Sequence, residues 1–309
     1  MKEYRHTIID NTTMAEYRLN RRHRDQMAIE KRQEKSEESF QQLRSWLESA
    51  DIENDHHRLR EAQTPGTGRW LFDHPQFKKW FDPVSRYVPL LLWLNGKPGA
   101  GKSVLSSMII DEAKKNALTQ NPQPTVLYFY CKSGVEEKDN FCAIGRSLLL
   151  QLLEPDSPVL DHMHTAFRSA KTKDTILRTK HLIEELLEKA LLACPSAYII
   201  LDGIDECQLE ERQPVIEWFK TFVTKKLPPG CEDQVRVLFV SQDDMRARHD
   251  FSGISSLAIK VEDNKGDMEL FAKGKANEIQ QKFSVPDEIR DTIATKVPQS
   301  SDGEYKGSF

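Results

Sequence analysis

The sequence lacks any stretch that is long and apolar enough to cross a membrane. Its longest apolar run, residues 88–94, falls far short of the roughly 18–20 residues that a spanning helix needs. The first ten residues also lack the apolar centre of a signal peptide. Five cysteines are present, odd in number and without a C-x-x-C pair, so neither a disulfide framework nor a zinc site is expected. These absences exclude a membrane partner and favour a reducing, cytoplasmic location.

A strong charge of one sign is also missing. The 309 residues include 44 Lys and Arg against 48 Asp and Glu, a formal net charge of −4. A chain so nearly balanced has no sequence-wide attraction for nucleic acid or acidic lipid. Arg21, Arg22 and Arg24 form a basic cluster, but acidic residues follow closely. We therefore expect no specific nucleic-acid partner.

Glycine and proline are absent from residues 13–60, which are dense in Arg, Lys, Glu and Gln. Thr13 and Glu16 have the spacing of a capping box at a helix start. Apolar residues recur at helical spacing only near the end of this segment, at Phe40, Leu43, Trp46 and Leu47. We assign residues 1–62 to a charged helical arm of one or two helices that docks near its C-terminal end. A solvated arm is favoured over a coiled coil or partner-binding helix, because no heptad pattern is sustained.

After Pro89 the pattern changes to short apolar runs separated by helical segments. The runs are continuous rather than alternating, as in parallel strands that are covered on both faces. Five strands are predicted, at Leu90–Leu94, Thr125–Cys131, Ala197–Leu201, Val235–Ser241 and Ser256–Val261. Helices are predicted at Ser103–Leu118, Ile144–Leu153, Ile176–Leu192 and around Trp218–Phe222. The alternation predicts a three-layer α/β domain with a mainly parallel sheet over residues 63–262, followed by an incomplete helical lid and tail over 263–309.

The strongest local signal is Gly-Lys-Pro-Gly-Ala-Gly-Lys-Ser at residues 96–103. It fits the P-loop pattern G-x-x-x-x-G-K-[ST] between a strand and a helix, as that motif requires. Glycines let the backbone N–H groups surround a phosphate, and the helix N-terminus adds a partial positive charge. The predicted nucleotide-binding residues are Gly96, Lys97, Pro98, Gly99, Ala100, Gly101, Lys102, Ser103 and Val104. Lys102 would reach the β- and γ-phosphates, and the Ser103 hydroxyl would hold Mg²⁺.

A second signal is the apolar strand that ends at Asp202, the pattern of a Walker B element. Asp202 would hold Mg²⁺, directly or through water. Asp205 and Glu206 follow closely, so either carboxylate could orient the attacking water and act as the catalytic residue. The tip of the next strand, Ser241-Gln242, either faces the γ-phosphate or simply begins a loop.

Three other features have ordinary structural explanations. His56-His57 is more easily a solvated pair than a metal site. Cys207 could be a nucleophile, but packing explains a free cysteine there better. The aromatic residues from Trp70 to Phe81 are expected mainly in the core, with one of them at most touching the nucleotide.

These motifs together resemble a NACHT domain, specifically the nephrocystin-like P-loop domain of fungal NLR-type proteins. The similar segments are Gly66–Leu71, Trp93–Ser103, Phe129–Cys131, Leu201–Cys207 and the Asp263-Asn264…Asp267 turn before the next helix. The Asp-Gly-Ile-Asp-Glu-Cys form with the upstream Thr-Gly-x-Trp-Leu is the most specific part.

The resemblance implies a STAND-type signalling switch that binds ATP or GTP with Mg²⁺, hydrolyses it slowly and oligomerises, of the fungal immunity and heterokaryon-incompatibility kind. It places Thr67–Trp70 near the base, and protein partners at the arm or in self-association. Relatives often have Ser-Arg where this chain has Ser241-Gln242, and a neutral Gln supplies no cation to the γ-phosphate. Relatives also continue past this point, so the chain resembles a truncated product.

Two other functions remain open: a P-loop kinase or motor ATPase, and a non-catalytic scaffold fragment. A weak Mg²⁺-dependent nucleoside triphosphatase activity is the enzyme activity that the motifs allow. The string Asn-Lys-Gly-Asp occurs at residues 264–267, but it lies in the predicted lid segment and not on a later predicted strand, where a guanine-reading motif is expected, so ATP is favoured over GTP.

Overall fold

The computed structural model describes residues 21–300 except for 22, 25, 28–30, 32–33, 35–36, 82–88, 154–159, 170–175 and 232–233. The capping box predicted at Thr13 and Glu16, Arg22 of the basic cluster, and the tail from residue 301 lie outside the described residues. The chain divides into two compact units. One comprises Met1–Leu47 with Leu153–Ile176, and the other comprises Glu48–Leu152 with Leu177–Phe309.

The larger unit is built on a parallel five-stranded sheet in the order β2-β3-β4-β1-β5. The strands are β1 (Leu91–Gly96), β2 (Thr125–Tyr130), β3 (Ala197–Asp202), β4 (Val235–Gln242) and β5 (Ser255–Ala258). Every residue of β1 and β3 is buried, as expected for strands covered on both faces. The strand that carries Asp202 is separated from the P-loop strand by β4 in the sheet. The predicted parallel sheet is confirmed.

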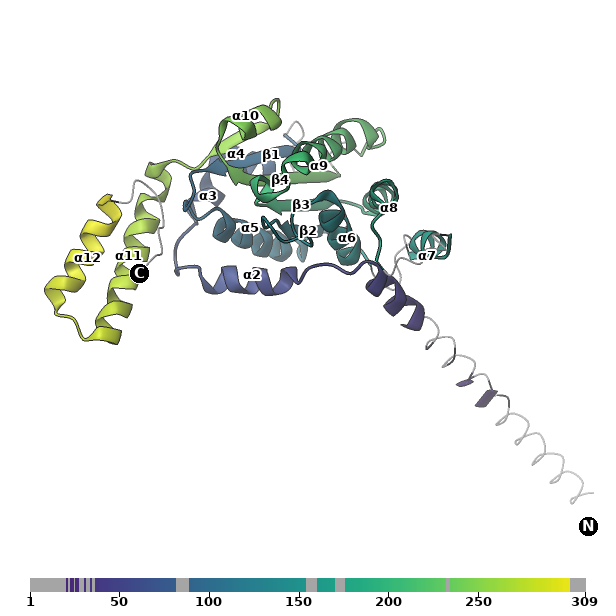
Figure 1. Cartoon of the computed structure of the whole chain (residues 1–309), viewed down its shortest axis with the longest axis horizontal. Helices are drawn as coiled ribbons and strands as arrows, with labels where there is room; N and C mark the ends of the chain where they lie inside the picture. The colour runs from purple at the N-terminus through teal and green to yellow at the C-terminus, as the bar shows by residue number, and fades with distance from the viewer. Residues whose placement is uncertain are drawn as a thin grey trace, which may run out of the picture. The chain divides into compact units, whose positions relative to one another are not determined.

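Helices cover both faces of this sheet. The helices between the strands are α5 (Lys102–Ala117), α6 (Phe141–Gln151), α8 (Lys180–Ala193), α9 (Leu209–Thr221) and α10 (Met245–Asp250). In Figure 1, α5 and α6 lie on either side of β2, and α10 lies above β1. Ahead of β1 lie α2 (Ile52–Glu61) and the short helices α3 (Trp70–Asp73) and α4 (Pro75–Phe81). The arrangement is the predicted three-layer α/β fold, in which the carboxyl ends of the strands and the start of α5 meet at one edge.

The last strand ends earlier than predicted. β5 stops at Ala258, and α11 (Val261–Phe283) begins where the prediction still had strand. The N–H group of Lys260 donates to the Asp263 carboxylate at 3.0 Å, which caps the new helix. Asp263, Asn264 and Asp267 therefore lie in the first turns of α11 and not in a turn before a helix. The Asp263 carboxylate thus starts a helix at a place where the apolar residues Ile259 and Val261 predict a strand.

Helix α2 packs on α5 and β2 through a polar cluster. His56 is 6% exposed, so the expectation of a solvated pair is wrong for this residue. Its ring nitrogens contact the Tyr130 hydroxyl and an Asp111 carboxylate oxygen, both at 2.8 Å. The Tyr128 hydroxyl donates to Glu53 at 2.6 Å. Buried polar groups are paired in this way when they lie between packed elements.

In the smaller unit, residues 37–46 are helical and α7 spans Leu160–Ser169. The rings of Trp46 and Phe167 meet edge to face at 5.4 Å between centroids. The Ser39 hydroxyl lies 3.1 Å from His164 Nδ1. Helix α7 was not predicted from the sequence, and it supplies the partner for the apolar end of the first helix.

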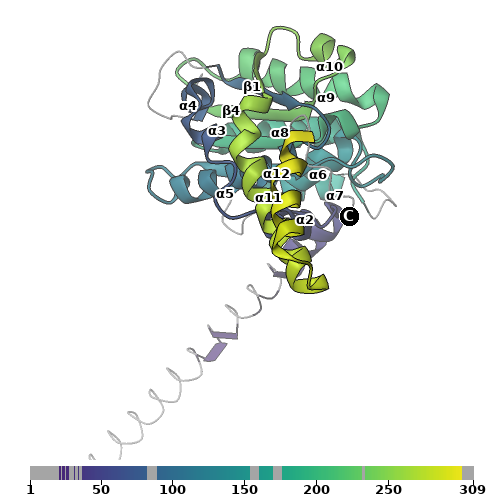
Figure 2. The same cartoon turned by 90° about the vertical axis from the view of Figure 1, so that its left-hand side faces the viewer.

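After the sheet, α11 and α12 (Asp287–Ser300) form a helical pair. The two helices lie side by side in Figures 1 and 2. Gln280 of α11 donates to Asp287 at 2.6 Å and accepts from Arg290 at 3.2 Å. None of the helices in the described part of the chain is long and apolar enough to span a membrane.

Candidate nucleotide site

The P-loop joins β1 to α5 at the carboxyl edge of the sheet. Gly99 and Gly101 have φ values of 73° and 78°, a conformation that a side chain would strain. This geometry lets the loop turn sharply into the N-terminus of α5. A cavity of about 370 Å³ lies beside it. It is lined by Pro98, Gly99, Gly101, Lys102, Ser103, Val104, Asp202, Gly203, Asp205, Glu206 and Gln242.

Lys102 lies across the P-loop. Its ammonium donates to the carbonyl of Gly96 at 3.0 Å and to that of Lys97 at 2.8 Å. Burial lowers the pKa of Lys102, while Asp205, Asp202 and Glu206 act in the opposite direction. The lysine is thus held within reach of the cavity and of its three carboxylates.

Asp202 at the end of β3 is a buried carboxylate. Its Oδ1 accepts from the Ser106 hydroxyl at 2.8 Å, and Ser103 also hydrogen-bonds to it. Burial raises the pKa of Asp202 from 3.8 to about 6, although both serine hydrogen bonds lower it. A buried anion with so few compensating charges favours either a proton or a cation. The Ser103 and Asp202 pair predicted for Mg²⁺ is therefore brought together.

A tight turn carries the two candidate catalytic carboxylates. Gly203 has φ 73°, and a Cβ there would meet the Cys131 carbonyl oxygen at 3.0 Å. The following residues form a short 3₁₀ turn, Ile204–Glu206. Asp205 accepts from the backbone N–H of Gln242 at 3.1 Å, and Glu206 accepts from that of Ser133 at 3.2 Å. Each carboxylate is thus tied to a neighbouring strand end, and both line the cavity.

The two polar residues at the end of β4, Ser241 and Gln242, lie in different environments. Ser241 is buried, and its hydroxyl accepts from the Trp93 indole N–H at 2.8 Å. Gln242 lines the cavity. Lys102 is the one basic side chain among the described residues that line it.

A smaller cavity of about 120 Å³ also adjoins the P-loop and shares Gly101 and Val104 with the first. Thr67, Gly68, Leu105, Met108 and Phe271 are among its lining residues. Asp267 of α11 accepts from the Gly68 N–H at 2.7 Å and from the Trp70 indole at 3.1 Å. Burial raises the pKa of Asp267, against these two hydrogen bonds. The segment that the resemblance places near the base is therefore fastened beside the P-loop.

The family model of the nephrocystin 3 N-terminal region matches residues 66–242. The chain belongs to this family. Its predicted resemblance to the NACHT-type domains of fungal NLR proteins is confirmed by a second match. The vegetative incompatibility protein HET-E-1 of Podospora anserina is 28% identical over 141 residues, which are 45% of this chain and 10% of that protein.

Among solved structures, the Cdc6p protein of Pyrobaculum aerophilum has a TM-score of 0.37 and 13% identity, over 69% of this chain and 51% of the other. The ORC2 protein of Aeropyrum pernix, in complexes with ADPNP and ADP, has a TM-score of 0.38 and 12% identity, over 68% of this chain and 62% of the other. Scores this low carry no argument about function. The chain spans about a tenth of the HET-E-1 length and about half to two thirds of these solved chains.

Not every predicted residue of this family member lines the cavity. Gly96 is buried at the end of β1 against Ile259, and Lys97 is exposed. Ala100 is buried, and its carbonyl accepts from Asn264 of α11 at 3.2 Å. These three residues shape the loop through backbone and packing. Cys207 is buried, as predicted for a packing role.

Sequence reasoning missed Ser106 and the role of Asn264. Ser106 lies one turn after Ser103 on the same face of α5, so the spacing could have indicated it. Asn264 acts across 164 residues of chain, and nothing local in the sequence indicates that contact.

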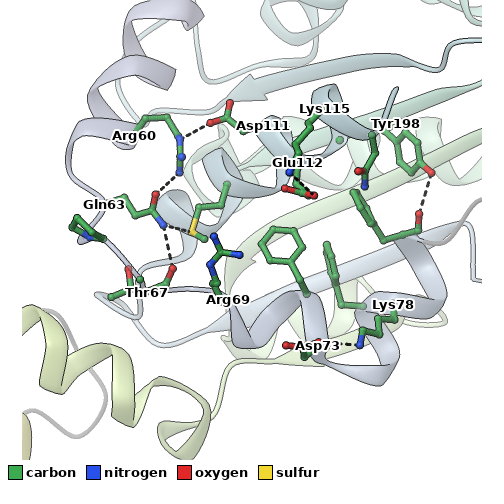
Figure 3. Close-up of a pocket in the computed structure, with 18 of the residues that line it drawn as sticks. Arg60, Gln63, Thr67, Arg69, Asp73, Lys78, Asp111, Glu112, Lys115 and Tyr198 are labelled. Atoms are coloured by element: carbon green, nitrogen blue, oxygen red, sulfur yellow. Dashed lines mark hydrogen bonds and ion pairs between the residues drawn. The ribbon is translucent and has the colours of Figure 1, made fainter. Parts of the chain in front are cut away.

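A larger cavity of about 860 Å³ lies apart from the predicted phosphate and metal residues (Figure 3). It is bordered by α2, the 63–69 segment, α3, α4 and α5. Arg60 pairs with Asp111 on its upper wall in that view, and Gln63 donates to the Thr67 carbonyl at 3.1 Å. None of the predicted P-loop, metal or catalytic residues is among its described lining residues.

Proposed function

We propose that this chain binds a nucleoside triphosphate, ATP rather than GTP, together with Mg²⁺, and works as a signalling switch with slow turnover. The observation that supports this proposal most directly is the 370 Å³ cavity at the start of α5. It is lined by Lys102, Asp202, Asp205 and Glu206 among other residues. A phosphate chain needs backbone N–H groups, a lysine and a cation in one place. The membership of the family supports nucleotide binding.

The residues present fit a magnesium ion. Asp202 is a buried carboxylate with a raised pKa, and two serine hydroxyls surround it. A divalent cation prefers such oxygen ligands, and its charge would offset the burial of the anion. Ser103 and Asp202 would hold the ion, which supplies charge neutralisation on the phosphates. Asp205 or Glu206 would orient the attacking water.

Slow turnover is supported by the shortage of cations around the cavity. Phosphoryl transfer develops charge that a second positive group, such as an arginine, normally stabilises. Lys102 is the single basic side chain among the described lining residues, and Gln242 at the tip of β4 is neutral. The site therefore supports tight binding better than fast hydrolysis.

The adenine would lie at the smaller cavity beside Thr67 and Gly68, where Leu105, Met108 and Phe271 offer apolar contact. Asp267 links this segment to α11. Helix α11 would thus sense an occupied site. We assign 1–62 to an arm, 63–262 to the nucleotide domain and 263–309 to a lid. Protein partners would bind at the arm, or the chain would self-associate, in the cytoplasm. The match to a vegetative incompatibility protein supports a signalling role.

The test measures ATP and GTP binding to the full chain with and without Mg²⁺ by calorimetry, and steady-state hydrolysis on the same sample. Mg²⁺-dependent ATP binding with less than about one turnover per minute, well below ordinary enzyme rates, supports the switch. Fast steady hydrolysis would support an ordinary nucleotide-consuming enzyme instead. Asp205→Asn and Glu206→Gln, measured under the same conditions, identify which carboxylate affects hydrolysis without lowering ATP affinity.

A further inference from the structure

Two cysteines meet beside the candidate catalytic turn. Cys131 follows β2, and Cys207 follows the 3₁₀ turn that carries Asp205 and Glu206. Their Sγ atoms are 3.4 Å apart, across 76 residues of chain. Each residue is 7% exposed. A disulfide has an S–S bond of about 2.05 Å, so the sulfurs need to approach by only about 1.4 Å.

Backbone hydrogen bonds hold both cysteines in this position. The Cys131 N–H donates to the Asp202 carbonyl at 2.8 Å, and the Cys207 N–H donates to the Ile204 carbonyl at 3.2 Å. The next residue, Gln208, donates to the Asp139 carbonyl at 2.7 Å. The sulfurs therefore face one another because the ends of β2 and β3 are fixed, and the pairing does not depend on a mobile loop.

We propose that Cys131 and Cys207 are an oxidisable thiol pair, and that their disulfide locks the turn bearing Asp205 and Glu206 to the end of β2. The other three cysteines, Cys142, Cys194 and Cys231, are half-buried and lie elsewhere on the fold. The oxidant class is a small peroxide. The cavity lined by Gly203 and Glu206 lies next to the chain of both cysteines, because Gly203 lies beside the Cys131 carbonyl and Glu206 directly precedes Cys207.

The chemistry balances with hydrogen peroxide. One thiol takes an oxygen from the peroxide and becomes a sulfenic acid, with release of one water. The second sulfur attacks that sulfur, the S–S bond forms, and the hydroxyl leaves as a second water with the remaining thiol proton. In sum two thiols lose two electrons and two protons, and one peroxide is reduced to two waters. Burial makes the first step slow.

The effect of the bond on the switch rests on the proposed function, whereas the bond itself does not. Closing the gap draws the Asp205–Glu206 turn toward β2 and removes its freedom to adjust to a phosphate. We expect the oxidised chain to bind Mg²⁺-ATP at least threefold more weakly than the reduced chain. We expect its melting temperature to rise, because a crosslink across a long loop constrains the unfolded chain.

The experiment treats the native full chain with hydrogen peroxide, caps the remaining thiols, digests the chain without reductant and analyses the peptides by mass spectrometry. The expected product is one peptide pair joined through Cys131 and Cys207, reversed by dithiothreitol. The Cys131→Ser and Cys207→Ser variants should each lose this product and the rise in melting temperature. Cys142→Ser should keep both.

Different results would contradict the thiol pair, the locking of the turn and the proposed function. Oxidation that leaves Cys131 and Cys207 as thiols, or joins either to another cysteine, overturns the pair. A crosslinked chain with unchanged ATP affinity and melting temperature overturns the locking of the turn. If the reduced chain does not bind nucleotide either, the proposed function fails, while the mass spectra still decide the pair.

Discussion

Asp202 lies at the candidate metal site, but its burial disfavours the charged form of the carboxylate. It is buried at the end of β3 with Ser103 and Ser106 as its hydroxyl partners, and its pKa is raised to about 6. When the pKa of a carboxyl group is higher in the folded chain than in the unfolded chain, the free energy of unfolding falls as the pH rises between these two pKa values. Below pH 3.8 both states hold the proton, and above about pH 6 neither does. The full penalty of about 3 kcal/mol therefore acts at neutral pH.

Asp202→Asn should remove this penalty. We expect the free energy of unfolding of the nucleotide-free chain to rise by about 1–3 kcal/mol at pH 7 and to change much less near pH 4, because the wild-type carboxyl is then protonated. Urea unfolding of both chains at the two pH values measures the difference. Asp205→Asn, half-buried on the same turn, is the control and should give no such gain. A loss of stability in Asp202→Asn at pH 7 would show that the carboxylate is already well compensated.

Gly203 is a second residue whose position fixes the site. It shares a φ of 73° with Gly134, but only Gly203 has a backbone oxygen 3.0 Å from the position of an added Cβ. Gly134→Ala should cost about 1 kcal/mol, the strain of a left-handed residue. Gly203→Ala should cost about 2–4 kcal/mol, because the chain must also shift. Chemical unfolding of the two variants compares them, and equal losses would mean that the contact with Cys131 is easily relaxed.

At the scale of elements, His56 is the buried polar side chain through which α2 contacts both β2 and α5. His56 contacts Tyr130 of β2 and Asp111 of α5 at 2.8 Å each, while the adjacent His57 is exposed. His56→Ala leaves the buried Tyr130 hydroxyl without this partner, while the half-exposed Asp111 keeps its ion pair with Arg60, and should lower the free energy of unfolding by about 1–3 kcal/mol. His57→Ala should change it by less than about 0.5 kcal/mol. Thermal unfolding of both variants tests this, and similar small effects would place α2 outside the cooperative unit.

The elements themselves were largely predictable, because β1 to β4 are continuous apolar runs whose predicted ends lie within two residues of the observed ones. The end of β5 was not, since Lys260 and Asp263 cap a helix inside an apolar stretch. Helix α7 was missed because it is short and half polar. The phosphate and metal residues follow from two local motifs. The contacts of Asp267 with Gly68 and of Asn264 with Ala100 cross 199 and 164 residues, and only the folded chain brings them together.

At the scale of the whole molecule, helix α11 after the sheet and the Gly68–Trp70 segment before it converge on the P-loop. Asp267 and Asn264 of α11 bind the Gly68–Trp70 segment and the loop itself. Any change in the P-loop on binding nucleotide therefore reaches α11 directly. This connection would be the physical basis of the proposed switch, in which α11 reports on the site.

The central claim is that this chain holds a nucleotide through the P-loop lysine. The most direct measurement is the Mg²⁺-ATP affinity of wild type, Lys102→Ala and Lys115→Ala by calorimetry. Lys115 lies on the same helix with a side chain that is 76% exposed, so its removal changes the net charge equally. We expect Lys102→Ala to weaken binding by about 10- to 100-fold, the value of a lost charge-assisted hydrogen bond, and Lys115→Ala to leave it within about twofold. Equal affinities for all three chains would contradict the account.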